Sequence, residues 1–187
     1  EPIGVIHFDA HADTSRGEFQ GHRYSDCTVF TNAVLERSID PEKVVQIGMR
    51  SAMLPYWDFN EEAGMRVIPM HEFFDIGVEG VLTEIKRVIG DSPFYLTLDI
   101  DGLDATAVPG TQLPEPFGLT TREVLQIIRG LRGMDLIGGD ICELSPPLDD
   151  RSGSTANTSA AFGFEVLCLL AEAHVKRHGR NRKTHWK

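Results

Sequence analysis

Apolar residues along the chain alternate between short continuous runs and longer stretches with helical spacing. The short runs, rich in β-branched residues, predict buried strands at residues 3–8, 43–49, 65–70, 94–101 and 134–144. The longer stretches, with apolar residues three or four positions apart, predict helices at residues 28–39, 77–89, 120–131 and 157–177. We expect Gly90 to close the second of these helices, and Thr120 or Thr121 to cap the third.

Strands that are apolar on both faces and joined by helices predict a parallel sheet covered on both sides. We therefore expect an α/β fold, a three-layer sandwich in one domain over residues 1–175, followed by a basic tail over residues 176–187. Residues 1–8 already have the pattern of a segment that leads into a core strand. We expect the chain to be the C-terminal part of a longer protein whose N-terminal portion is missing. Ligands of such sheets bind beyond the carboxyl ends of the strands.

The charge of the chain is acidic and unevenly distributed, with a net value of −10. The tail from Lys176 carries six of the 18 Lys and Arg residues and no acid, so the remainder, with 12 basic and 28 acidic residues, lies near −16. Basic residues gathered only in a terminal tail are not typical of a nucleic-acid-binding protein.

Neither a membrane protein nor a secreted one is expected. Glu165 interrupts the longest apolar run, and no secretory signal is visible. Three cysteines without paired spacing favour free thiols in the cytoplasm.

Two acidic clusters lie at the ends of predicted strands. Asp9, His11 and Asp13 follow the first strand, and Asp99 and Asp101 end the fourth. Either cluster alone is also compatible with helix capping or hydration, but four carboxylates at adjacent strand ends cannot all stay ionised unless cations neutralise them. An oxygen-rich ligand set favours Mn²⁺ over zinc. Two such ions, about 3.5 Å apart, would share and acidify a bridging water, which becomes a hydroxide nucleophile near neutral pH.

These motifs resemble those of the ureohydrolase family, which includes arginase, agmatinase and guanidinobutyrase. The family patterns Asp-Ala-His-x-Asp and Ser-x-Asp-x-Asp-x-x-Asp-Pro-x-x-x-Pro-Gly-Thr are similar to residues 9–13 and 97–111. Residues 138–150 resemble a later Asp-x-x-Glu-x-x-Pro segment, and the resemblance runs from Val5 to about Glu172. It implies an arginase-like fold, two Mn²⁺ ions per subunit (Ni²⁺ being the alternative), hydrolysis of a small cationic guanidino substrate to urea and an amine, and a homo-oligomer, either a trimer or a hexamer.

The resemblance also assigns roles to the metal ligands. Asp9 and Asp99 would bridge both ions, Asp13 would bind the first ion, and His11 and Asp101 would bind the second.

Other residues of the same motifs are given roles around the ligands. Glu143 would accept the guanidinium of the substrate in a charge-assisted pair. Asp104 would order its loop, and His7, on the strand face of Asp9, is expected in the core or behind the ligands.

The chain departs from the family pattern beside this site. The remaining metal ligand of the family is a histidine in an upstream Gly-Gly-Asp-His segment, which has no counterpart before Asp9 in this sequence. The family also has a His-Gly-Thr whose histidine shuttles protons, and Asp26-Cys27-Thr28 stands in its place. Because a carboxylate holds almost no proton at pH 7, Asp26 would be a poor general acid. His22, in the same loop, is therefore a second candidate for the shuttle.

Two functions stay open on these grounds. The first is an amidinohydrolase that acts on an agmatine-like compound or a guanidino acid. Gln112, Leu113 and Phe117 stand where agmatinases carry a Gly-Thr-Pro-x-x-Gly-Gly loop, so the substrate is not fixed by the sequence. The second is a catalytically degenerate paralogue that acts as a structural or regulatory subunit of a hetero-oligomer. The intact ligand set favours the enzyme, whereas Asp26 and the absent upstream histidine favour the degenerate subunit.

Overall fold

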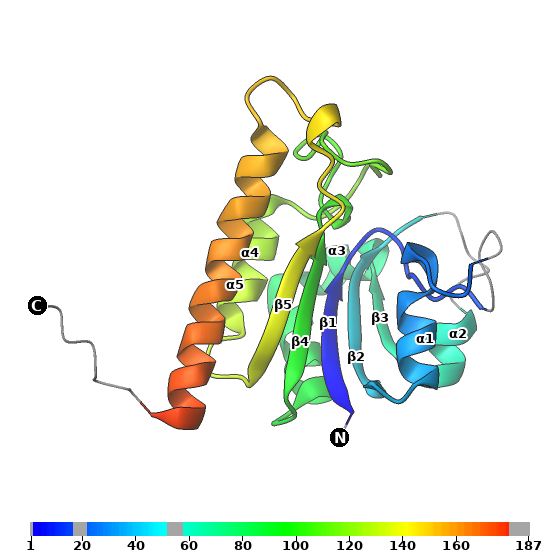
Figure 1. The fold of residues 1–187 in the computed structure, drawn as a ribbon, viewed down its shortest axis with the longest axis vertical. Helices are drawn as coiled ribbons and strands as arrows, with labels where there is room; N and C mark the ends of the chain where they lie inside the picture. Colours follow the sequence, from blue (N-terminus) through cyan, green and yellow to red (C-terminus); the bar gives the residue numbers. More distant parts are fainter. Residues whose placement is uncertain (1, 17–21, 52–57, 180–187) are drawn as a thin grey trace, which may run out of the picture.

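The sheet of this protein is parallel, and the point where its strand order reverses lies beside the acidic motifs. The computed structural model describes residues 2–16, 22–51 and 58–179. Within them, five strands form one sheet in the order β3-β2-β1-β4-β5, and each neighbouring pair is parallel (Figure 1). The strands are β1 (Ile3–Phe8), β2 (Ile39–Met49), β3 (Arg66–Pro69), β4 (Phe94–Asp99) and β5 (Leu136–Cys142). The chain runs outward from β1 to β3 and then returns to the other side of β1. The switch point where parallel sheets bind ligands therefore lies between β1 and β4.

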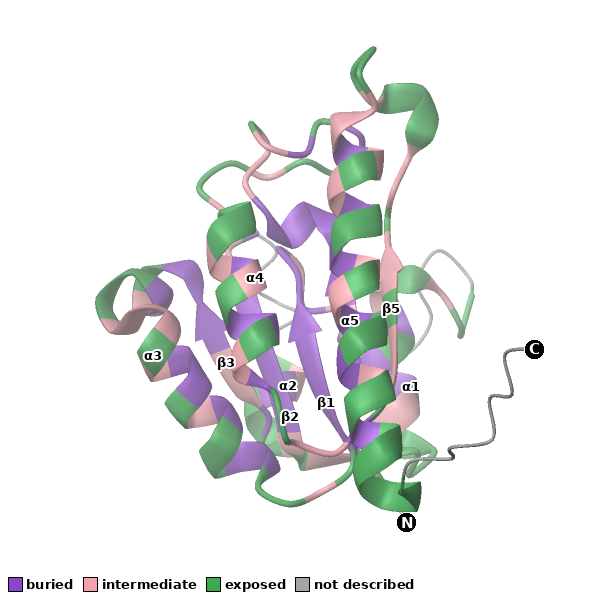
Figure 2. Cartoon of the chain, turned by 90° about the vertical axis from the view of Figure 1, so that its left-hand side faces the viewer, coloured by how far each residue is buried: buried purple, intermediate pink, exposed green. Residues whose placement is uncertain are grey.

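Helices cover both faces of the sheet, as the sequence predicts. On one face lie α3 (Met70–Ile89), α4 (Thr121–Gly130) and α5 (Ser154–His178), and on the other lie α1 (Val29–Leu35) and α2 (Asp58–Ala63) (Figure 1). Short 3-10 turns are η1 (Asp26–Thr28), η3 (Ile100–Gly102) and η4 (Pro146–Leu148). β1 and the carboxyl-terminal half of β2 are buried between these layers, whereas β5, at the edge of the sheet, is partly exposed (Figure 2). The predicted three-layer α/β fold is confirmed.

The core consists of one large and one small cluster of buried side chains, one on each face of the sheet. Ile6 and Phe8 of β1 belong to the large cluster, which also takes Phe162 from α5. Val5, on the opposite face of β1, belongs to the small cluster with Phe30 of α1. Each fully buried side chain of this size contributes about 1.5–3 kcal/mol to folding. Because successive residues of β1 enter opposite clusters, both faces of this strand are held, and its carboxyl end has a fixed position.

Local sequence explains most helix boundaries. Thr120 caps α4: its hydroxyl accepts from the backbone N–H of Glu123 at 3.2 Å, and the Glu123 carboxylate accepts from the backbone N–H of Thr120 at 2.8 Å. Gly90 closes α3 with a positive φ of 56°. The structure extends α3 back to Met70, seven residues before its predicted start, with a break at Gly77 where φ is 60°. The helix α2 was not predicted, because its six residues are too few to show helical periodicity.

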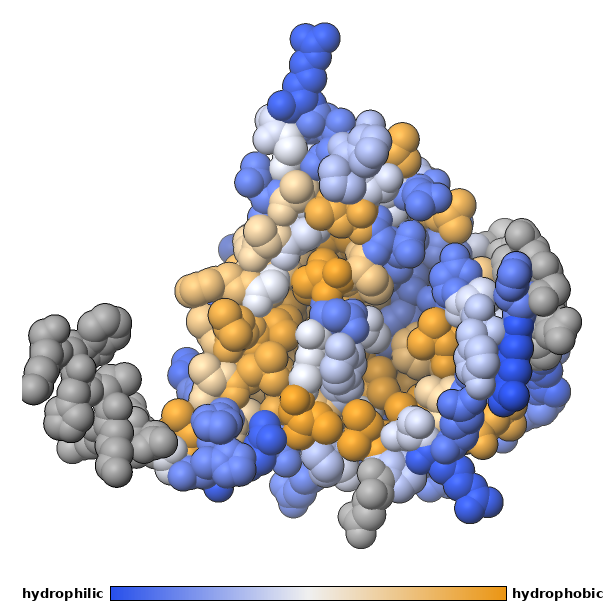
Figure 3. All heavy atoms as spheres, in the orientation of Figure 1, coloured by the Kyte–Doolittle hydropathy of each residue, from blue (hydrophilic) through white to orange (hydrophobic). Residues whose placement is uncertain are grey.

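The last helix is apolar for most of its length. By length and composition alone α5 could cross a membrane, but one of its faces packs on β5 and α4. Figure 3 shows apolar surface over the region of α5 and β5; exposed large apolar side chains of these elements are Phe164, Leu167, Val175 and Ile137. The helix ends at His178, inside the predicted tail, and residues 180–187 lie outside the described residues.

Two glycines let neighbouring segments approach the backbone of Asp9 closely. A Cβ on Gly102, after β4, would lie 2.8 Å from the Asp9 nitrogen, and a Cβ on Gly48 of β2 would lie 2.8 Å from the Asp9 carbonyl oxygen. Gly48 also has a positive φ of 103°, a conformation that side chains with a Cβ rarely adopt. Both contacts involve backbone atoms, which cannot rotate away. The end of β1 is therefore enclosed by the two adjacent strands, and the acidic motifs are held together.

Replacing Gly102 with alanine should test this enclosure. The added methyl group meets the Asp9 backbone, so we expect Gly102→Ala to lower the free energy of unfolding by about 1–3 kcal/mol, as for other overpacked sites. Gly163→Ala is the matched control, since a Cβ there meets only Ile141 at 4.0 Å. Inside α5 an alanine should stabilise the protein by about 0.5–1 kcal/mol. Urea unfolding of both variants measures the two values, and equal stabilities would contradict the enclosure.

Candidate metal centre

A cavity of about 480 Å³ opens at the carboxyl ends of β1, β4 and β5. Its wall contains all five predicted metal ligands together with Glu143, Asp26 and Cys27. The complete lining comprises Asp9, His11, Ala12, Asp13, Ser15, Asp26, Cys27, Ser51, Asp99, Asp101, Gln112, Leu113, Pro114, Glu115 and Glu143. The strand order thus brings together two motifs that are about ninety residues apart in the sequence.

Asp9 is the innermost carboxylate of the cavity and is 1% exposed. One carboxylate oxygen accepts from the backbone N–H of His11 at 2.6 Å, and the other lies 2.8 Å from Nε2 of His7. Burial alone would raise the pKa of Asp9, but the two histidines and the backbone N–H hold this pKa well below its ordinary value. Asp9 is therefore an ionised carboxylate with fixed orientation.

Asp99 and Asp101 approach Asp9 from the end of β4. Asp99 accepts from the backbone N–H of Asp101 at 2.9 Å, and Asp101 accepts from the backbone N–H of Ala10 at 3.2 Å. The second bond joins the two acidic motifs directly. Burial, followed by the charges of Asp9 and Asp101, raises the pKa of Asp99 to about 10. The pKa of Asp101 is also raised, chiefly by burial. Without a cation, these side chains resist ionisation.

His11 supplies positive charge between the carboxylates. Its Nδ1 lies 3.2 Å from Asp101 and 3.4 Å from Asp9, and its Nε2 lies 3.7 Å from Glu115. Hydrogen bonds to Asp101 and then to Asp9 raise the pKa of His11 to about 11. The imidazolium thus supplies the positive charge that a bound metal cation would supply, and His11 would then bind as a neutral ligand.

Asp13 and Glu143 enter the cavity from strained backbone. Both have left-handed φ angles, 52° and 57°, which for residues other than glycine cost energy and concentrate at functional sites. Burial, and then the charge of Asp9, raises the pKa of Asp13 to about 8. Partial desolvation, and then Asp101, raises the pKa of the exposed Glu143.

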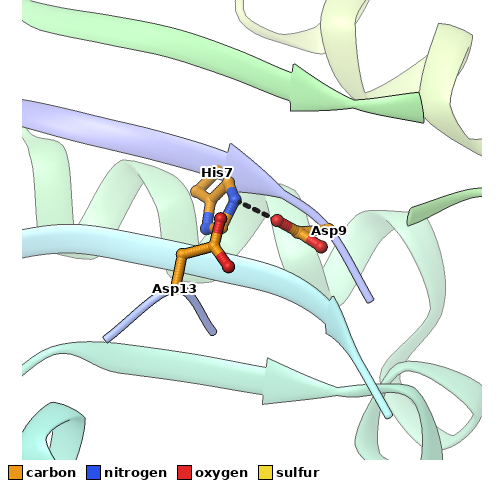
Figure 4. Close-up of side chains that lie close together, drawn as sticks. All are labelled: His7, Asp9 and Asp13. Atoms are coloured by element: carbon orange, nitrogen blue, oxygen red, sulfur yellow. Dashed lines mark hydrogen bonds and ion pairs between the residues drawn. The ribbon is translucent and has the colours of Figure 1, made fainter. Parts of the chain in front are cut away.

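Potential ligand atoms come together in two groups that share one carboxylate, Asp9, whereas Asp99, the other predicted bridge, is in neither group. Potential ligand atoms within 4.8 Å of one another form two groups, His7, Asp9 and Asp13 in the first and Asp9, His11 and Asp101 in the second (Figure 4 shows the first). Asp9 belongs to both groups, as a bridging ligand must. His7 differs from the rest because both of its ring nitrogens are engaged, one with Asp9 and one with Gln46. We therefore place His7 behind Asp9 rather than among the ligands.

The remaining predicted site residues have different positions. Asp26 lies on the cavity wall and is exposed, and its carboxylate accepts from the backbone N–H of Cys27 at 2.9 Å. The pKa of the Cys27 thiol is raised to about 11 by burial and by Asp26, so this thiol is not reactive. His22 is exposed and is not among the lining residues. Phe117 is 76% exposed and also lies outside the lining, whereas Gln112 and Leu113 belong to it.

Sequence reasoning missed Arg50, which supports the cavity loop. Its guanidinium donates to the backbone carbonyls of Asp101, Leu103 and Glu115 at 2.7–2.9 Å, and three further carbonyls, those of Gly48, Gly102 and Pro116, also accept from it. One side chain at the end of β2 thus connects the second acidic motif to the segment of Glu115, a lining residue that was also missed. In the sequence, the only sign that Arg50 supports the site is its location at the end of a predicted strand.

The raised pKa values predict how pH affects stability. In the folded, metal-free protein Asp13, Asp99 and His11 keep protons that the unfolded chain, with ordinary pKa values of 3.8 for Asp and 6.5 for His, releases. The free energy of unfolding should therefore fall as pH rises from 6.5 to 8.5. Mn²⁺ should replace these protons and reduce the slope, and Asp99→Asn should reduce it without metal. Urea titrations with EDTA or Mn²⁺ measure the slopes, and stability that rises over this range in EDTA would contradict the argument.

Comparison with known proteins places this chain in a family. The family model described as "Arginase family" matches residues 1–169. The chain is 46% identical over 177 residues to guanidinopropionase and 41% identical over 170 residues to guanidinobutyrase, both from Pseudomonas aeruginosa. Its structure is similar to that of proclavaminate amidino hydrolase from Streptomyces clavuligerus, with a TM-score of 0.86 at 38% identity.

The matches cover nearly all of this chain but only part of its relatives. They span 94% of the chain and 55% of guanidinopropionase, 90% and 53% for guanidinobutyrase, and 92% and 57% for the amidino hydrolase structure. The chain therefore spans about half the length of the curated relatives it matches. The family match over most of the chain agrees with the resemblance drawn from its acidic motifs, and the chain belongs to the arginase family.

Proposed function

We propose that the complete protein hydrolyses a guanidino compound to urea and an amine. One observation supports this most: the five predicted ligands, Asp9, His11, Asp13, Asp99 and Asp101, line one cavity together with Glu143. The two relatives named above point to short guanidino acids as the first substrates to test. An agmatine-like compound is the alternative, supported by an agmatinase from Chromobacterium violaceum at 39% identity.

Two Mn²⁺ ions would be held by side chains at the switch point of the sheet. Asp9 would bridge them, with Asp99 as the second bridge, Asp13 on the first ion, and His11 and Asp101 on the second. Four carboxylates balance the four positive charges of two such ions, and oxygen donors with one imidazole suit Mn²⁺. When bound, such ions polarise the substrate and lower the pKa of water.

The other lining residues would bind the substrate and move protons. Glu143, at the exposed side of the cavity, would accept N–H bonds from the guanidinium and orient its carbon toward the ligand cluster. The leaving amine needs a proton, and the wall offers Asp26 in the position where the family pattern has a histidine. A carboxylate beside bound cations donates poorly at pH 7. Proton delivery is therefore the weak step of the proposed reaction.

Asp26 also supports a second candidate function. A paralogue that has lost proton delivery but kept its ligands would act as a structural or regulatory subunit of a hetero-oligomer. We favour the enzyme, because buried unpaired carboxylates are costly and the ligand set is complete at all five positions of this chain. A homo-oligomeric, cytoplasmic enzyme remains part of the proposal.

The first test measures metal content and product together. The complete protein should bind two Mn²⁺ ions per subunit and release urea from at least one of 3-guanidinopropionate, 4-guanidinobutyrate, agmatine and arginine. Asp99→Ala should lose both ions because it removes a bridge. Asp140→Asn is the matched control, since this carboxylate accepts from Tyr95 and Thr97 and lies outside the cavity lining. Two bound ions with no urea from any substrate would favour the degenerate subunit.

The second test restores the proton donor. The double variant Asp26→His with Cys27→Gly recreates the His-Gly-Thr of the family at the cavity wall. Turnover should rise at least about tenfold, since a positioned imidazole is worth about 10²–10⁴ in rate. Metal content should not change, because neither residue is a proposed ligand. If turnover stays flat while His22→Ala abolishes it, His22 carries the proton instead.

A further inference from the structure

A line of buried polar side chains leads from α2 to Asp9 along the face of the sheet that α1 and α2 cover. Thr14, Asn60 and Gln46 are 0% exposed, His7 is 2% exposed and Asp9 is 1% exposed. The Thr14 hydroxyl donates to the side-chain oxygen of Asn60 at 2.5 Å, and the Asn60 amide donates to the side-chain oxygen of Gln46. The Gln46 amide nitrogen lies 3.0 Å from Nδ1 of His7, whose Nε2 lies 2.8 Å from Asp9.

The backbone carbonyl of Ala12 fixes the direction of this line. Gln46 Nε2 lies 2.8 Å from that carbonyl, which can only accept, so the group facing it must be the NH₂ of the amide. The same NH₂ faces Nδ1 of His7, which must then carry a lone pair. The proton of the neutral ring is consequently on Nε2 and is donated to Asp9. Every bond from Thr14 to Asp9 thus runs in one direction.

The line also contacts residues at both ends of the first acidic motif. His7 and Asp9 stand at its beginning, whereas Ala12 and Thr14, which Gln46 and Asn60 contact, stand at its end. Figure 4 shows the consequence, with the carboxylates of Asp9 and Asp13 beside the His7 ring. Gln46 and Asn60 come from β2 and α2, so elements outside the motif set the spacing of its two carboxylates.

A purely structural role does not account for this arrangement. The His7 ring packs against Phe30 with ring centroids 4.4 Å apart, and apolar side chains of similar size would fill the same space. Buried polar groups are costly unless each is paired. Here each side chain donates a hydrogen bond to the next one. The last acceptor is the carboxylate of Asp9, which is proposed to bridge two ions.

We propose that His7, Gln46 and Asn60 are positioning residues that orient the Asp9 carboxylate and set its distance from Asp13 for metal binding. This inference rests on the proposed metal-dependent function. Partners that stand behind metal ligands fix the orientation of the ligands and raise affinity. His7 donates to one oxygen of Asp9 and so restricts the rotation of the carboxylate. Gln46 prevents the alternative tautomer of His7, and Asn60 holds Gln46.

The test measures the Mn²⁺ affinity of the complete protein by calorimetry, and the EPR spectrum of the bound Mn²⁺. His7→Leu, which keeps the packing but removes the donor, should weaken Mn²⁺ binding by about 10- to 100-fold. His7→Gln, whose amide can place a donor near the position of Nε2, should recover most of this loss and the native spectrum. Gln46→Met should weaken binding similarly, and the double variant His7→Leu with Gln46→Met should lose less than the two single losses combined.

Thr31→Val provides the matched control. Within the described residues, the hydroxyl of Thr31 is buried without a hydrogen-bond partner, so its removal should leave Mn²⁺ affinity unchanged. Native affinity in His7→Leu, or equal losses in His7→Leu and His7→Gln, would overturn the inference. If His7→Leu does not fold, native affinity in a folded Gln46→Met overturns it instead. Native protein that binds Mn²⁺ tightly but yields no urea would reject the proposed function and leave this inference standing.

Discussion

Burial of negative charge at the end of β1 is the constraint on which this site depends. Asp9, Asp99 and Asp101 are no more than 4% exposed, and a buried unpaired carboxylate costs several kcal/mol. Asp9 is stabilised by two histidines and a backbone N–H. The high pKa values of Asp99 and Asp13 show that the same protein groups do not suffice for all four acids. Bound cations would neutralise the remaining acids, and the geometry that brings the acids together would then hold these cations.

Keeping the acids together requires support from outside the two motifs. Gly48 and Gly102 allow the neighbouring strands to contact the Asp9 backbone. Arg50 donates hydrogen bonds to carbonyl groups of the loop that follows β4 and so satisfies these acceptors. Its positive charge also lies near the acids, and among the described residues no carboxylate forms an ion pair with it. Repulsion among the acids is thus opposed by backbone contacts.

Much of the fold, and the convergence of the two acidic motifs on one cavity, could be predicted from the sequence, because both depend on short-range patterns. Apolar runs identified the strands, and Thr120 and Gly90 marked helix ends. The ligands lie in compact motifs at strand ends. The line through Gln46 and Asn60 could not be predicted, since its contacts join residues 14 to 46 positions apart. A glutamine inside an apolar strand gives no sign of the partner it will meet.

A substitution at the cavity wall lowers the free energy of unfolding less than a substitution among the buried residues of the ligand cluster. Asp9, Asp99, Asp101 and the line behind them are buried, so a change there leaves unpaired polar groups and reduces stability. Asp26, Gln112 and Leu113 are exposed on the wall, where most substitutions change stability by less than about 0.5 kcal/mol. Side chains of the wall can therefore change while the arrangement of the buried acids stays intact. Five predicted ligands that are all present, beside Asp26 where the family pattern has a histidine, are the combination that this difference in stability allows.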